Sequence, residues 1–208
     1  MQRIHPCATL DAALNALDNG GRFYHLFSDA RDEVIDAGEL ARAAGVIGDR
    51  QKVWLYFDMA LADLSSDHTE QVVRRLSPAL REQRARHRPR SIDPADLAGG
   101  GVDAGDAVVV TGIPHYTNDE SHFRGFITMV TPVTALIPII EVYQTYLLET
   151  GGDAGSRAAR IATARKTERL PQRPARFGGI VKALQDASGS TSPDEVYLEV
   201  AYVTPIPA

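Results

Sequence analysis

Two short blocks of this chain are rich in arginine, a residue whose guanidinium group binds phosphate. Residues 74–90 hold seven arginines against one glutamate, and residues 157–176 hold six arginines and one lysine against one glutamate. Each block has a formal net charge of +6, although the whole chain of 208 residues has a net charge of −5. Arginine clusters neutralise phosphates and release their counterions, so the blocks favour a polyanionic partner. The residues expected to contact phosphate are Arg74, Arg75, Arg81, Arg84, Arg157, Arg160, Arg165 and Lys166.

Single-stranded nucleic acid is the most specific partner that these blocks predict. Two basic helices on one side of the molecule would form a groove for the phosphate backbone, and aromatic rings would stack on the bases. Tyr143 and Phe177 are the candidates for stacking. Two other interpretations stay open: the arginines cover solvated helix faces, or they pair with the acidic surface of another copy or another protein. The acidic total charge counts against nucleic acid, since most nucleic-acid-binding domains are basic.

The segment 114–122, with the sequence PHYTNDESH, offers a different chemistry. We expect it to be a loop between two strands, and His115, Asp119 and His122 are residue types that ligate metal ions. Two histidines and one carboxylate would leave a coordination position open for water, as a metal-dependent hydrolase requires. The spacing matches no zinc-binding motif, however, and polar residues are common in any hairpin loop. The hydrolase is therefore an alternative to a binding function.

The densest apolar stretch of the chain lies between residues 106 and 149 and must supply much of the core. Its β-branched runs predict strands at 107–111, 123–131 and 135–148. Residues 125–140 carry no charge, but 16 residues with two prolines are too short and too interrupted for a membrane-spanning helix. The run 135–148 also offers an apolar β surface through which copies of the chain could assemble. Assembly into homo-oligomers is thus a further alternative function.

The order of the expected elements indicates an α+β fold in two parts. The first part, residues 1–98, is small and mixed, with helices at 10–17 and 36–44, a strand at 53–58 and a basic helix from about residue 67. A segment rich in proline and glycine, 88–105, is the expected linker. The second part, residues 102–208, reads as three strands, a basic helix from Ser156 to about Leu170, and two strands at 176–184 and 196–203. That β-β-β-α-β-β order is the order of an OB barrel, although other barrels and sandwiches share it.

Composition places the chain among ordinary globular proteins, with 44% hydrophobic and 24% charged residues. Its single cysteine, Cys7, excludes an intrachain disulfide framework, and the N-terminus lacks a secretory pattern. A cytoplasmic location is expected from these two features. The sequence holds no nucleophile elbow, kinase motif set, HExxH motif or phosphate-binding loop. We therefore expect a binding module without a cofactor rather than an enzyme.

Overall fold

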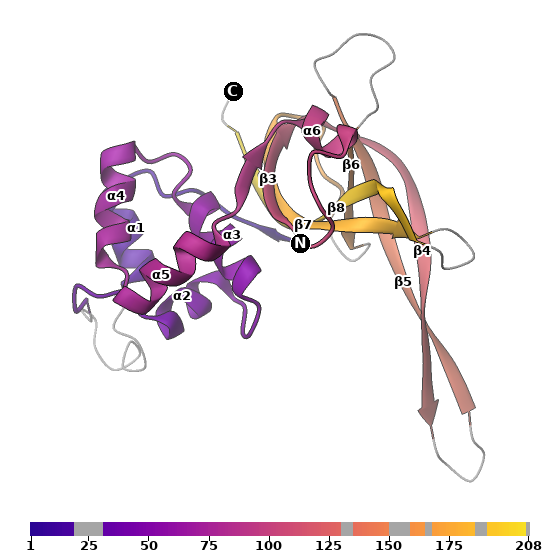
Figure 1. The fold of residues 1–208 in the computed structure, drawn as a ribbon, viewed down its shortest axis with the longest axis horizontal. Coiled ribbons are helices and arrows are strands. Elements are labelled where there is room, and N and C mark those ends of the chain that lie inside the picture. Colours follow the sequence, from indigo (N-terminus) through magenta and orange to yellow (C-terminus); the bar gives the residue numbers. More distant parts are fainter. Residues whose placement is uncertain (19–30, 130–134, 150–158, 165–167, 186–190, 207–208) are drawn as a thin grey trace.

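The computed structural model describes residues 1–18, 31–129, 135–149, 159–164, 168–185 and 191–206. A helical part comes first and a mixed β-sheet follows it (Figure 1), so the predicted α+β class is confirmed. The helical part comprises α1 (Leu10–Leu17), α2 (Ala37–Ala44), α3 (Arg50–Ala60), α4 (Ser66–Arg75) and α5 (Pro78–His87). The sheet contains β1 (Gln2–Arg3), β2 (Arg90–Ile92), β3 (Ala107–Gly112), β4 (Pro114–Met129), β5 (Ala135–Leu148), β6 (Ala159–Ala164), β7 (Ala175–Gln185) and β8 (Thr191–Pro205), with α6 (Pro94–Gly99) between β2 and β3.

The sheet runs in the order β2-β3-β7-β8-β6-β5-β4, and β1 pairs with β8. The long contacts β4–β5, β5–β6, β3–β7 and β7–β8 are antiparallel, whereas β1–β8, β2–β3 and β6–β8 are parallel. The sheet's own core includes Val108, Tyr146, Phe177, Val181 and Leu198, all fully buried. The far ends of β4 and β5 extend beyond the sheet as a two-stranded ribbon (Figure 1).

Local capping explains where the predicted helices begin and end. Thr9 caps α1 by accepting a hydrogen bond from the backbone N–H of Ala12. Asp36 and Glu39 form a capping box at the start of α2, and Gly45 ends that helix with φ 65°, a left-handed conformation that glycine adopts without a steric penalty. These helices surround a core in which Trp54 and Phe57 pack edge to face, with ring centroids 5.6 Å apart.

The strand predicted at 53–58 is wrong, because these residues lie within α3. Asp49 caps this helix and accepts a hydrogen bond from the backbone N–H of Lys52. Trp54 and Phe57 face the helical core, whereas Leu55 and Met59 face the sheet. A helix that is apolar on two sides shows no clear amphipathic period, so its short apolar run resembles a buried strand.

The basic helix predicted from Ser156 to Leu170 is also wrong, since residues 159–164 form β6. This strand pairs with β5 on one side and with β8 on the other. Ala159, Ile161, Ala162 and Thr163 are all buried, so residues on both of its faces are covered. The alanine-rich sequence favours a helix locally, but pairing on both edges within the sheet overrides that propensity. The helix of the OB-like element order is therefore absent from 159–164.

The helical part and the sheet meet through α3. Leu55 and Met59 lie against β7 at Gly178, where any added Cβ atom would collide with the Met59 sulfur. Tyr202 of β8 donates a 3.2 Å hydrogen bond from its hydroxyl to the carbonyl oxygen of Ala44, and burial raises the pKa of Tyr202 to about 12. The two parts thus share a core, and the domain boundary placed between residues 98 and 102 stays a prediction.

The expected linker has structure of its own. Within 88–105, β2 pairs with β3, and Leu97 of α6 is buried in the core of the sheet. A further difference concerns the expected loop 114–122, which forms the first half of β4. Finally, no helix among the described residues is long and apolar enough to cross a membrane.

Candidate functional site

Most arginines of the first block form ion pairs with carboxylates of the same chain. On the exposed surface of α4 and α5, Arg74 lies 2.6 Å from Glu70, and Arg86 pairs with Glu82. Arg90 lies 3.3 Å from Asp106, which directly precedes β3. Arg75 approaches two carboxylates, Glu33 at 3.5 Å and Asp18 at 4.0 Å. These contacts compensate much of the formal charge of the block.

Arg84 is the most enclosed arginine of this block. Its guanidinium lies 3.1 Å from Asp58 and 5.5 Å from the centre of the Phe57 ring, which is fully buried. The side chains of Arg84 and Asp58 are 16% and 18% exposed, so water screens this pair only weakly. Arg88 reaches the same carboxylate at 3.5 Å. Arg84 therefore joins α5 to α3 and is poorly placed to contact a phosphate.

Arginines of the second block have fewer ion-pair partners among the described residues. Arg169 and Arg173 lie on the exposed segment between β6 and β7, and neither makes an ion pair with any residue that the structure describes. Arg160 is half-buried on β6 and likewise has no ion pair among those residues, whereas Arg176 lies 2.7 Å from Asp63. Arg157, Arg165 and Lys166 lie outside the described residues, and their predicted phosphate contacts stay predictions.

The guanidinium of Arg169, which has no ion pair among the described residues, lies over an aromatic ring. Tyr116, near the start of β4, is 39% exposed, and the Arg169 guanidinium lies 4.2 Å from the centre of its ring. The Tyr146 ring meets the Tyr116 ring edge to face, with centroids 5.7 Å apart, and the Tyr116 hydroxyl donates a 3.0 Å hydrogen bond to Asp119. The Tyr146 hydroxyl in turn accepts a 3.1 Å hydrogen bond from the backbone N–H of Leu170. These contacts fix the segment that carries Arg169 against the start of β4.

The two aromatic residues expected to stack on bases are buried, which corrects that expectation. Tyr143 is 6% exposed and Phe177 is fully buried, because their strands are covered on both faces. Among the residues that the structure describes, Tyr116 is the exposed aromatic residue, and sequence reasoning passed over it. It lies within the segment 114–122 that was considered for metal binding, but its proximity to Arg169 depends on a contact across 53 positions of the chain.

The proposed metal ligands turn towards different partners along β4. His115 lies with Nε2 2.8 Å from a Glu149 oxygen and with Nδ1 2.5 Å from the side-chain nitrogen of Gln172. Asp119 instead accepts the Tyr116 hydrogen bond. The part of the chain that the structure describes contains no group of three metal-ligating side chains. The side chain of His122 lies outside that description, so the metal centre stays a prediction from the sequence.

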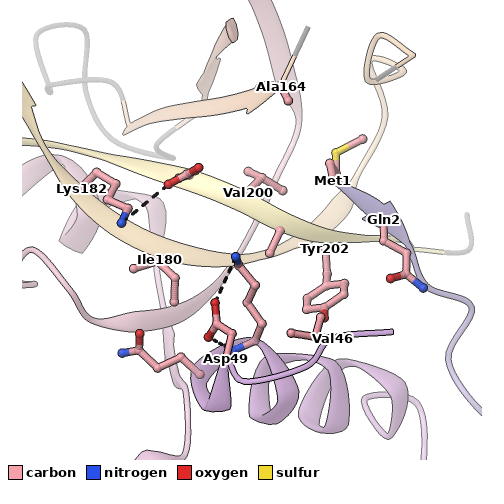
Figure 2. Close-up of a pocket in the computed structure, with 13 residues that line it drawn as sticks. Met1, Gln2, Val46, Asp49, Ala164, Ile180, Lys182, Val200 and Tyr202 are labelled. Carbon is pink, nitrogen blue, oxygen red and sulfur yellow. Dashed lines mark hydrogen bonds and ion pairs between the residues drawn. The ribbon is translucent and has the colours of Figure 1, made fainter. Parts of the chain in front are cut away.

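A pocket of about 420 Å³ lies between the start of α3 and the strands β1, β7 and β8 (Figure 2). Its two lysines each face a carboxylate: Lys52 lies 3.1 Å from Asp49, and Lys182 lies 3.8 Å from Glu199. Burial alone would raise the pKa of Asp49, but hydrogen bonds from Lys52 outweigh it, and the pKa is lowered. An anion entering the pocket would have to compete with these carboxylates. We therefore place the candidate anion site at Tyr116 and Arg169 instead.

Comparisons with known proteins give a fold likeness and no family. No protein-family model matches the chain, and no curated protein matches it. A crystal structure of the N-terminal domain of an archaeal MCM superimposes with a TM-score of 0.42 at 11% sequence identity. The match covers 96% of this chain and 100% of that one. A likeness of this size assigns no activity to the protein.

Proposed function

We propose that this protein is a non-enzymatic binding module for an anionic partner, most specifically a single-stranded nucleic acid. The observation that carries the proposal is the pair formed by Arg169 and Tyr116 at the start of β4. It combines a guanidinium without an ion-pair partner among the described residues and an exposed ring. Proteins that bind single strands use this combination, because cations contact the backbone and aromatic rings stack on the bases.

Arg173 extends the proposed contact surface beyond Arg169. The two arginines lie four positions apart on the exposed segment before β7, and neither has an ion pair among the described residues. Arg157, Arg165 and Lys166 belong to the same block and are proposed as further backbone contacts. Arg160 is half-buried and is proposed as a contact at the margin.

The first block has a smaller role in this proposal. Arg74 and Arg75 would have to exchange their carboxylate partners for a phosphate, and Arg84 would also have to leave the Phe57 ring. Arg81 is exposed on α5 and has no ion pair with the residues described, so it is the member of the block best placed to bind. The block otherwise acts through its long-range field, which salt screens over about 10 Å at 0.1 M.

Binding of a fluorescent oligothymidylate at several salt concentrations tests the proposal. We expect the wild-type affinity to fall steeply as salt rises, because each phosphate contact contributes about 0.7 to the logarithmic salt slope for a single strand. The double variant Arg169→Ala/Arg173→Ala should lower the affinity at low salt and reduce the slope by about 1.4.

The matched control is Arg74→Ala/Arg86→Ala, which also removes two exposed arginines, but two that already have carboxylate partners. Its affinity and slope should stay close to wild type. Lack of binding by the wild-type protein at low salt would refute the proposal. Equal losses in the two double variants would refute the assignment of the contacts to the second block.

A further inference from the structure

A small depression opens in the surface beside the start of β4. Its volume is about 10 Å³, which is room for one water-sized group. Its lining is largely apolar and includes Leu170 and Phe177. Arg3 of β1 and Arg173 of the segment before β7 also line it, and they are the charged members among the described residues at its wall. Two arginines from distant parts of the sequence therefore border the same small area.

No carboxylate compensates these two arginines within the part of the chain that the structure describes. Arg3 and Arg173 are both exposed, and neither makes an ion pair with a described residue. By contrast, Lys52 and Lys182 of the larger pocket each face a carboxylate (Figure 2). Like charges side by side repel one another, and an anion bound between them would remove that repulsion. An anion can therefore bind at the depression without displacing a described carboxylate.

The depression adjoins the proposed binding site at Tyr116 and Arg169. Pro114 lines the depression, and Tyr116 follows two positions later on a regular stretch of β4, so both lie on one face of the strand about 7 Å apart. Leu170 lines the depression as well and directly follows Arg169. That separation is close to the length of one extended nucleotide. A phosphate next to a base that stacks on the Tyr116 ring can therefore reach the two arginines.

We propose that Arg3 and Arg173 together bind the terminal phosphate of a strand whose end base stacks on Tyr116. The assignment rests on the proposed function and narrows its ligand to a phosphorylated strand end. A terminal phosphate monoester carries a charge of about −1.5 to −2 at pH 7, whereas an internal phosphodiester carries a single negative charge. Two guanidinium groups match the larger charge, and each can bind phosphate oxygens through paired hydrogen bonds. Arg3 belongs to neither basic block, so the clustering of charge in the sequence does not mark it.

Calorimetry with unlabelled hexathymidylates tests the contribution of the terminal phosphate. Three ligands are compared at low salt and pH 8: one without a terminal phosphate, one with a 5′-phosphate and one with a 3′-phosphate. One phosphorylated form should bind at least about fivefold more tightly than the unphosphorylated form, because it adds hydrogen bonds between charged groups. The favoured end gives the polarity of the bound strand. The preference should shrink at pH 5, since a terminal phosphate loses its second charge below a pKa of about 6.

Charge-removing variants assign the preference to the two arginines. Arg3→Gln and Arg173→Gln should each abolish the preference for the phosphorylated end, and both should unfold at the wild-type temperature because the side chains are exposed. Arg50→Gln is the matched control. Arg50 is also exposed and has no ion pair with the residues described, but it does not line the depression. This variant should keep the full preference.

The outcomes separate this assignment from the proposed function. Equal wild-type affinities for the three ligands would overturn the terminal-phosphate site and leave single-strand binding intact. A preference that persists in Arg3→Gln, or one that Arg50→Gln loses equally, would also overturn it. Absence of binding by all three ligands at low salt would instead refute the proposed function, and the terminal-phosphate site with it.

Discussion

The two basic blocks have the same formal charge of +6, but the fold uses them in different ways. In the first, Arg84 lies over the buried Phe57 ring and pairs with Asp58, so the guanidinium joins two helices. In the second, Arg169 lies over the exposed Tyr116 ring and has no ion pair among the described residues. The same cation–π contact is thus part of the core in one region and part of the surface in the other.

The comparison teaches that formal charge and available charge are separate properties. Six of the seven arginines of the first block have carboxylates on neighbouring helical turns or on neighbouring elements, so their charge is compensated before any partner arrives; Arg81 is the exception among the described residues. Arg169 and Arg173 keep theirs because the segment that carries them faces no described carboxylate within ion-pair distance. A cluster of arginine in a sequence indicates a binding surface only where the fold leaves it unpaired.

The largest expected effect concerns the internal pair of the first block. Arg84→Ala should lower the free energy of unfolding by about 2 kcal/mol, because it leaves Asp58 with only the longer contact to Arg88 and removes packing from Phe57. Urea denaturation measures this change. Arg74→Ala is the control, since its exposed pair with Glu70 should contribute less than about 0.5 kcal/mol. Equal changes in the two variants would show that Arg84 is as solvated as Arg74.

A smaller effect is expected at Tyr116, whose exposed ring lies beside Arg169 of the second block. Tyr116→Leu should weaken oligothymidylate binding by about fivefold, since stacking on an aromatic side chain contributes roughly 1 kcal/mol or more per base. Inorganic polyphosphate offers the same kind of charge without bases, and its affinity should not change. Competition by each anion against the labelled oligonucleotide measures both. A parallel loss for both anions would indicate that the ring positions Arg169 and does not stack on bases.

The smallest expected effect comes from freeing the arginines of the first block. Glu70→Gln/Glu82→Gln removes the partners of Arg74 and Arg86, so the affinity for oligothymidylate should rise by about twofold at low salt and return to the wild-type value at high salt. Fluorescence anisotropy at the two ionic strengths measures it. If the affinity stays at the wild-type value at low salt as well, the first block does not bind the oligonucleotide because of its position on the molecule, and its ion pairs are not the cause.

Much of the secondary structure follows from local signals in the sequence. The caps at Thr9 and Asp36 mark helices that the structure confirms, and β-branched runs mark β3, β5, β7 and β8. The failures occur where burial on two sides removes the periodic pattern, as in α3, or where pairing on two edges overrides helix propensity, as in β6. The polar segment 114–122 resembles a loop because β4 is an edge strand whose first half bears many polar residues.

Less of the candidate site can be predicted from local signals in the sequence. The sequence marks the second basic block, but the pairing of Arg169 with Tyr116 joins the segment before β7 to the start of β4. Tyr143 and Phe177 have the same chemistry as Tyr116 and are lost to binding only because strands cover them. Burial of an aromatic ring is a property of the assembled sheet and has no local sequence signal.

The sequence by itself determined the α+β class, the segregation of arginine into two blocks and the uncharged stretch 125–140, because composition and local propensity depend on near neighbours in the chain. Tertiary structure alone decided which arginines meet a carboxylate, which aromatic ring remains exposed and which strand lies at the edge of the sheet. Each of those outcomes depends on contacts between distant segments, and such contacts are set by the packing of the whole core.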